Sequence, residues 1–267
     1  MRIAIAAHFE AGSVKLAQAL QERGVEEIFN GIPEEVIANL HIIQERVTAN
    51  EISTLTPEDS DWPSQLNDLS APPVLLFVRG HRSLLSQRSL AIVGTRNPTA
   101  YGVKMASEFA TGFVDRKWAI VSGGAYGIDS AAHKGALIAE GVTIAVTAAG
   151  LDSPYPAGNQ RLFDEIVESG VLISEYLPGV TARPHRFLVR NRLIAALSKG
   201  TLVVEAAFRS GSLRTAREAA ELMRPVMAIP GLITSPTSDG CHRLIGERRA
   251  ELVTSVADAH ELMSSLV

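Results

Sequence analysis

Four arginines lie within eleven residues of the chain, and no acidic residue separates them. They are Arg183, Arg186, Arg190 and Arg192, in the stretch RPHRFLVRNRL. A guanidinium group binds phosphate through paired hydrogen bonds and stacks on flat rings, so this residue type suits nucleic acids. The whole chain has a formal net charge of −4, and a polyanion would therefore have to be held by a local field. The cluster predicts a localised anion-binding site.

These arginines are expected to have different surroundings. A helix is expected to begin within the cluster, and cations at a helix start oppose its dipole unless an anion compensates them. Arg186 and Arg190 are therefore predicted to face solvent together as an anion site. For Arg192, an internal ion pair with Glu175 or Glu205 is the alternative to an anion contact.

Three loops rich in glycine and serine follow predicted strands. In an open parallel sheet, ligands bind outside the carboxyl ends of the strands, where helices begin and their free N–H groups attract anions. The alternative is that the glycines only close tight turns and that Ser212 only caps a helix. Three such loops together favour a shared anionic groove. The loop residues concerned are Gly94, Thr95, Arg96, Ser122, Gly123, Gly124, Ser210, Gly211 and Ser212.

Known catalytic patterns do not fit the chain. The dinucleotide fingerprint G-x-G-x-x-G, the phosphate loop G-x-x-x-x-G-K-[ST] and the hydrolase motif G-x-S-x-G find no proper match. Seven histidines are scattered without metal-ligand spacing. His133 is expected to make a structural hydrogen bond, and Asp129 and Glu205 to cap a helix or anchor a basic partner. The sequence predicts no catalytic residues, no metal and no cofactor.

The elements that must position these residues alternate regularly from Leu90 onward. Short runs such as LAIVG, WAIVSGG, VTIAVTA, GVLISE, TLVVEA and PVMAIPG are apolar throughout, as strands buried on both faces of a parallel sheet require. The order of strands and helices predicts an α/β fold with a Rossmann-like, doubly wound, mostly parallel sheet. Helices are expected around residues 101–116, 127–140, 159–169, 189–199 and 212–223.

Composition and texture divide the 267 residues into three parts. Residues 1–60 have apolar spacing typical of a small N-terminal helical domain. A stretch rich in Pro, Asp and Ser, residues 56–73, is expected to lie on the surface of the next domain as a connector. The core domain is predicted over residues 61–245 and a short tail, with one more helix, over 246–267. One cysteine, no apolar run of membrane-spanning length and no signal peptide favour a cytoplasmic protein with no membrane contact.

Seven blocks in this order resemble the DNA-processing protein A family, also called Smf. The resemblance covers Asp61 to Ile245, about two thirds of the chain. The blocks are LAIVGTRNPTAYG, VSGGAYGIDSAAHKGAL, GLDSPYPAGNQRLF, LISEYLPG, FLVRNRLIAALS, VVEAAFRSGSLRTAREA and MAIPG. Many family members also carry a C-terminal winged-helix module, and the residues after Ile245 are expected to be too few for one.

The resemblance implies a homodimer with no catalytic activity that binds single-stranded DNA without sequence preference. It also implies protection of incoming strands in natural transformation and help in loading the RecA recombinase. The alternative is a nucleotide-binding or nucleotide-hydrolysing enzyme on the same scaffold. Phe187, Phe208 and Tyr101 are candidates for base stacking. The predicted DNA-binding residues are Gly94, Thr95, Arg96, Ser122, Gly123, Gly124, Arg186, Phe187, Arg190, Asn191, Arg192, Ser210, Gly211 and Ser212.

Overall fold

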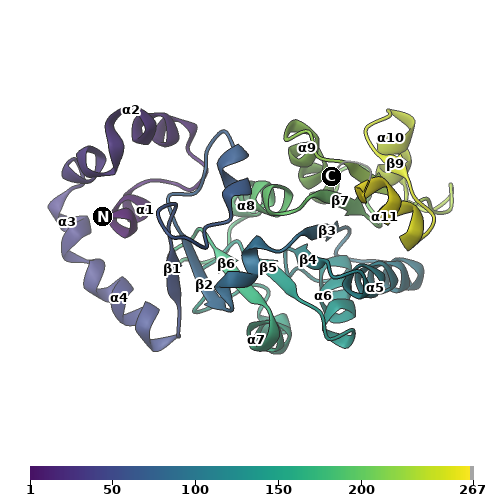
Figure 1. The fold of residues 1–267 in the computed structure, drawn as a ribbon, viewed down its shortest axis with the longest axis horizontal. Helices are drawn as coiled ribbons and strands as arrows, with labels where there is room; N and C mark the ends of the chain where they lie inside the picture. The colour runs from purple at the N-terminus through teal and green to yellow at the C-terminus, as the bar shows by residue number, and fades with distance from the viewer. Residues whose placement is uncertain (265–267) are drawn as a thin grey trace.

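A computed structural model of the chain describes residues 1–264. These residues form one sheet of nine strands in the order β1-β2-β6-β5-β4-β3-β7-β8-β9 (Figure 1). The strands are β1 Ser53–Leu55, β2 Leu76–Gly80, β3 Ser89–Val93, β4 Ala119–Ser122, β5 Thr143–Val146, β6 Val171–Ser174, β7 Gly200–Val203, β8 Val226–Ala228 and β9 Glu251–Leu252.

Strands β3 to β9 pair in parallel, whereas β2 pairs antiparallel with both β1 and β6. From β3 the chain first adds β4, β5 and β6 on one side and then returns to add β7, β8 and β9 on the other. The strand order therefore reverses between β3 and β7, which is where open α/β sheets bind ligands. The predicted Rossmann-like, mostly parallel sheet is confirmed.

Helices cover both faces of the sheet, which explains why its strands are apolar throughout. One face carries α5, α6 and α7, and the other carries α8 and α9 (Figure 1). The bounds are α5 Ala100–Asp115, α6 Ile128–Ile138, α7 Gln160–Ser169, α8 Pro184–Leu197, α9 Ser212–Glu221, α10 Asp239–Gly246 and α11 Val256–Ser264.

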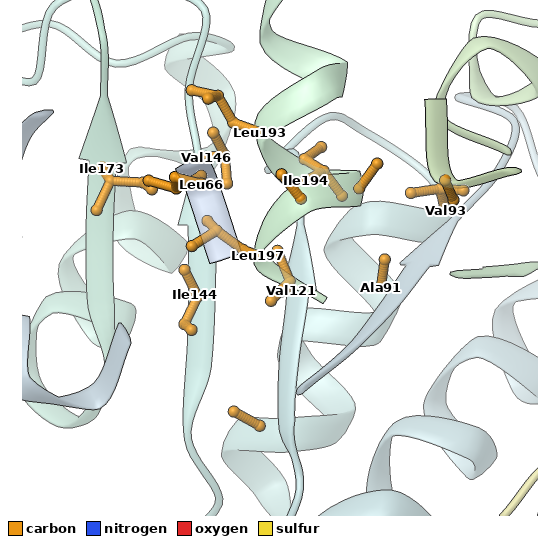
Figure 2. Packing of buried hydrophobic residues seen from close by; sticks show 14 of the residues in the cluster. Leu66, Ala91, Val93, Val121, Ile144, Val146, Ile173, Leu193, Ile194 and Leu197 are labelled. Carbon is orange, nitrogen blue, oxygen red and sulfur yellow. The ribbon is translucent and has the colours of Figure 1, made fainter. Parts of the chain in front are cut away.

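The core between α8 and the sheet is built from aliphatic side chains. Ile144 and Val146 of β5 face Leu193 and Leu197 of α8, and all four are almost completely buried (Figure 2). Burial of a Leu, Ile or Val side chain contributes about 1.5–3 kcal/mol. This packing fixes the face of α8 that turns toward the sheet, and with it the direction of the arginines on the same helix.

The stretch 56–73 differs from its expectation as a surface connector. It contains the short helix η1 Ser64–Asp68, whose Leu66 is fully buried beneath α8 (Figure 2). Trp62 and Leu69 join the same core, and the Trp62 indole N–H donates to Asn67 at 3.0 Å. The prolines and acids that suggested a loop surround three apolar side chains that need burial, and this burial outweighs the turn-like composition.

Four helices precede the sheet and pack beside it: α1 Arg2–His8, α2 Val14–Asn30, α3 Glu34–Ala38 and α4 Leu40–Ala49 (Figure 1). They share a small apolar cluster of their own around Ala4, Ile5 and Ile28. The division into domains at residues 60 and 245 stays a prediction. Within residues 1–264, no helix combines the length and apolar character needed to cross a membrane.

Candidate functional site

A groove of about 720 Å³ opens at the carboxyl edge of the sheet, between the ends of β3 and β7. Its walls are the loops after β3 and β7, helix α8 and the first turn of α9. Single residues from the loops after β4 and β5 and from α6 complete the lining. This is the topological switch point of the sheet. The location agrees with the general rule for ligand sites in doubly wound folds.

Helix α8 forms one wall, and its two ends are fixed differently. It begins at Pro184, with Arg183 as its N-cap residue, earlier than the expected start at residue 189. Proline is tolerated at a first helical position, and this signal could have located the start. At the other end Arg224 donates to the carbonyl groups of Ala195 at 2.6 Å and Ser198 at 2.9 Å, and also to Ala196. The arginine thus satisfies carbonyl groups that the helix leaves open.

Three arginines at the rim of the groove are exposed: Arg96 after β3, Arg183 at the start of α8 and Arg209 after β7. None of the three forms an ion pair with a residue in the range 1–264. The Arg96 guanidinium lies 4.8 Å from the ring centre of Phe187. Arg183 and Arg209 were not among the predicted site residues, although Arg183 lies in the arginine cluster itself.

Arg190 was expected to face solvent, and this prediction was wrong. Arg190 is only 4% exposed. Its guanidinium lies against Gly123, and a Cβ atom added to Gly123 would overlap it. Burial lowers the pKa of Arg190 to about 10, the charge of Asp129 opposes this shift, and that of Arg96 adds to it. Packing of the last two turns of α8 on the sheet turns Arg190 inward, which arginine spacing alone does not show.

The glycine loop after β4 also faces inward. The amides of Gly123 and Ala125 donate to the same carboxylate oxygen of Asp129, at 3.1 and 3.4 Å. Burial raises the pKa of Asp129, while the charge of Arg190 and these hydrogen bonds oppose the shift. The Ser122 hydroxyl is also buried and donates to the Ile92 carbonyl at 2.6 Å. The Gly123 amide, which was expected to meet phosphate, thus already has an acceptor, which is Asp129.

Arg192 forms the predicted internal ion pair. One of its guanidinium nitrogens, Nη2, donates to both carboxylate oxygens of Glu175 at 2.6 Å, and both residues are buried. The Gly12 amide donates to the same carboxylate, so the loop before α2 closes over the pair. Burial raises the pKa of Glu175, and Arg192 opposes the shift. Arg192 does not line the groove.

Arg186 also lies outside the groove wall. Its guanidinium stands 5.1 Å from the ring centre of Tyr176 and donates to the Thr181 carbonyl at 2.5 Å. It lines a smaller cavity, of about 160 Å³, between the N-terminal helices and the sheet. The expected pairing of Arg186 with Arg190 in one solvent-facing site is therefore wrong.

The serine and glycine loop after β7 does line the groove. The hydroxyl groups of Ser210 and Ser212 are 2.7 Å apart, and the Asn191 side-chain amide donates to the Gly211 carbonyl at 3.1 Å. Gly211 is the N-cap residue of α9 and has a helical conformation, with φ −63° and ψ −23°. A Cβ atom at Gly211 would meet no other described atom within 4 Å. The side chain of Ser212 does not cap α9, in contrast to the alternative considered from sequence.

Glu205 and His133 also have structural partners. The Glu205 carboxylate accepts from the backbone N–H and the hydroxyl of Thr99, at 2.9 and 2.6 Å, just before α5. His133 makes the predicted structural hydrogen bond, 2.7 Å from the hydroxyl of Thr143. Burial lowers the pKa of His133 to about 3. Among residues 1–264, no group of three or more His, Cys, Asp or Glu side chains is placed to hold a metal ion.

The structure thus divides the predicted site residues into two sets. Five do not line the groove: Ser122, Gly123, Gly124, Arg186 and Arg192. The residues that do line it are Gly94, Thr95, Arg96, Phe187, Arg190, Asn191, Ser210, Gly211 and Ser212.

Comparison with known proteins identifies relatives of the whole fold. A structure of DNA processing protein A from Streptococcus pneumoniae has a TM-score of 0.83 and 35% identity, covering 97% of this chain and 95% of that one. A Helicobacter pylori DNA processing protein A, described for its single-stranded DNA binding mode, has a TM-score of 0.72 and 32% identity, covering 81% of this chain and 95% of that one.

Sequence relatives agree with the structural ones. A Mycobacterium tuberculosis protein named as a DNA processing protein DprA is 45% identical over 225 residues, which are 79% of this chain but 58% of that protein. The chain therefore spans somewhat more than half of that relative. The model of the family described as DNA recombination-mediator protein A matches residues 53–264. The resemblance seen in the sequence blocks is confirmed, and the chain belongs to the DNA recombination-mediator protein A family.

Proposed function

We propose that the groove binds the backbone of single-stranded DNA without sequence preference. The observation that carries this proposal is the set of exposed arginines at its rim, Arg96, Arg183 and Arg209, which have no carboxylate partner among residues 1–264. Unpaired guanidinium groups around a concave site attract phosphate. The Helicobacter relative, described for its single-stranded DNA binding, supports the same ligand.

The groove offers few means of reading a base sequence. Its exposed cations suit phosphate oxygens, which are the same in every nucleotide, and phosphate contacts position a strand without specifying it. Aromatic side chains beside a basic groove stack on any base. Low sequence preference and strong dependence on salt concentration follow from this combination.

We further propose that the groove binds its ligand and does not transform it. The carboxylates nearest to it, Asp129 and Glu205, accept hydrogen bonds from loop amides and from Thr99. His133 is fully buried and uncharged at neutral pH, because its pKa falls to about 3. A general base has to reach the proton that it abstracts. Asp129 and Glu205 are engaged in holding the loops, and His133 is hydrogen-bonded to Thr143 of β5.

The wider role is also a proposal. The family name, recombination-mediator protein, supports help in loading RecA on single strands. We also propose that the protein protects incoming DNA during natural transformation, as a homodimer in the cytoplasm. These activities are tested by the nuclease resistance of a bound strand, by the rate of RecA filament formation on that strand with and without the protein, and by sedimentation of the protein alone.

The binding proposal is tested by titrating a labelled 30-nucleotide oligo-dT and a matching duplex at several salt concentrations. The double variant Arg96→Ala/Arg209→Ala removes two rim cations. We expect the unmodified protein to prefer the single strand. We expect the variant to bind more weakly and to lower the slope of log affinity against log salt by about 1.4, since each phosphate contact on a single strand contributes about 0.7.

The matched control is Arg23→Ala/Arg161→Ala. Both of these arginines are exposed on helices, pair with a carboxylate four residues on and do not line the groove. This variant changes the net charge by the same amount, so it isolates position from total charge. Equal weakening by the two double variants would contradict the proposal. Binding and turnover of a mononucleotide, without preference for a single strand, would favour the alternative of a nucleotide-processing enzyme.

A further inference from the structure

One exposed tyrosine, Tyr155, lines the groove and has not been assigned a contact with DNA. It comes from the loop between β5 and η3 (Ala157–Asn159) and is 46% exposed. Its ring lies 5.7 Å from that of Phe187, at an interplanar angle of 65°. An edge-on aromatic contact of this kind fixes the orientation of a ring while leaving part of its surface open. Tyr155 is thus a fixed flat surface directed into a basic groove.

Phe187, the stacking candidate within the arginine cluster, is less available than Tyr155. The guanidinium of Arg96 lies over its ring at 4.8 Å, and Tyr155 contacts the same ring. Phe187 is only partly exposed as a result. The Phe187 ring instead holds two neighbouring side chains in place, those of Arg96 and Tyr155. The other two candidates, Phe208 and Tyr101, do not line the groove.

We propose that Tyr155 is a stacking site for one unpaired nucleobase, placed beside the phosphate contact of Arg96. The inference rests on the proposed function and extends it, because it assigns the base of the strand a position as well as its backbone. Phe187 holds both groups: it carries the Arg96 guanidinium on its ring and the Tyr155 ring at its side. Stacking needs a base that is not already stacked in a duplex, so this site would contribute to the preference for single strands.

The test compares oligo-dT with a strand of the same length in which every nucleotide is abasic. Both strands carry the same phosphates, and only one of them carries bases. We expect Tyr155→Ala to weaken binding of oligo-dT by about fivefold or more, the effect of one lost base–aromatic stack. Binding of the abasic strand should not change. Tyr155→Phe keeps the ring and should bind oligo-dT as the unmodified protein does.

Tyr101→Ala is the matched control, because Tyr101 is 45% exposed and lies outside the groove. It should bind both strands normally. Equal weakening of both strands by Tyr155→Ala would overturn the inference, since it would show a structural role alone. No effect on either strand would also overturn it. Failure of the unmodified protein to bind oligo-dT at all would instead overturn the proposed function, and the inference with it.

Discussion

The exposed arginines of the groove and the buried arginines of α8 show how one residue type serves opposite purposes within a short distance. Arg96, Arg183 and Arg209 extend into solvent at the rim. Arg190 and Arg192, both on α8, are only 4% and 8% exposed. Arg192 is paired with the buried Glu175, and Arg190 is in the field of the buried Asp129. Arg183 and Arg190, about two turns apart on α8, therefore belong one to the binding surface and the other to the interior.

The buried partners explain this division. A charge removed from water loses several kcal/mol of solvation, and only a close opposite charge with good hydrogen bonds offsets that loss. Glu175 meets this requirement for Arg192. For Arg190 the charge of Asp129 offsets only part of the loss: the two form no ion pair among residues 1–264, and burial lowers the pKa of Arg190 to about 10. A rim arginine needs no such partner, because water solvates it, and its charge remains available to a ligand. A guanidinium group near a site is therefore evidence for binding only when no buried carboxylate neutralises it.

The largest effect on stability is expected when the carboxylate partner of a buried arginine is removed. Glu175→Ala leaves Arg192 charged and unpaired in the interior. We expect the free energy of unfolding to fall by about 3–5 kcal/mol, the typical cost of breaking a buried ion pair. Denaturant unfolding measures this loss directly.

The control replaces both members of the pair with apolar side chains, Glu175→Leu/Arg192→Met. Replacing a buried pair with well-packed apolar groups is often neutral, so much of the lost stability should return. If Glu175→Ala unfolds at the same denaturant concentration as the unmodified protein, the pair does not hold α8 to the loop around Gly12.

A second prediction uses a buried group that stays uncharged. The pKa of His133 falls to about 3 in the folded protein because the ring is buried, whereas the unfolded chain has the ordinary value of about 6.5. Between these two values the unfolded state binds the extra proton, so stability falls as the pH is lowered. We expect His133 to contribute a loss of about 2 kcal/mol between neutral pH and pH 5.

The measurement compares urea unfolding of the unmodified protein and of His133→Leu at pH 7 and pH 5. The ring nitrogen Nε2 of His133 has no hydrogen-bond partner among the described residues. An apolar replacement therefore loses no hydrogen bond at that nitrogen. The loss of stability at pH 5 should be smaller in the variant. The same loss in both proteins would mean that other groups titrate in its place.

The sequence predicts the fold more completely than the site. Uniformly apolar strands and regular alternation with helices determine the parallel sheet, and the loops at its carboxyl edge follow from that topology. The orientation of a residue on α8 depends instead on the contacts of Leu193 and Leu197 with distant strands. Arg190 turns inward for this reason, and no local pattern shows it. Pairing of Arg192 with a carboxylate was predictable, because Glu175 ends a buried strand beside the cluster.

The sequence does not identify Arg209, Tyr155 or the burial of Leu66, and the reason differs for each. Arg209 is one cation in a loop without a charge pattern, and only its place at the groove distinguishes it. Tyr155 lies in a turn far along the chain from Phe187, and tertiary contact alone brings the two rings together. Burial of Leu66 also depends on distant strands. Spacing along a chain predicts neighbours on one element, whereas these contacts join separate elements.

Smaller effects are expected at two glycines, one beside a buried arginine and one in the groove. Gly123 touches a buried arginine: a Cβ atom there would overlap the Arg190 guanidinium. Gly123→Ala should push that group away from Asp129 and lower stability by about 1–3 kcal/mol, as overpacked interiors do. At Gly211 a Cβ atom would meet nothing within 4 Å among residues 1–264, and the backbone is already helical. Gly211→Ala should therefore raise stability by about 0.4–1 kcal/mol, because it restricts the unfolded chain.

Binding measurements on the Gly211→Ala and Gly123→Ala variants distinguish a residue that lines the groove from one in the interior. Glycine allows a ligand to approach the backbone closely, and Gly211 lines the groove whereas Gly123 does not. Gly211→Ala should therefore weaken oligo-dT binding even though the folded protein becomes more stable. A loss of affinity without a loss of stability cannot come from misfolding, so it would locate the strand at this loop. Unchanged affinity in Gly211→Ala would mean that the strand passes over the rim arginines without reaching the loop after β7.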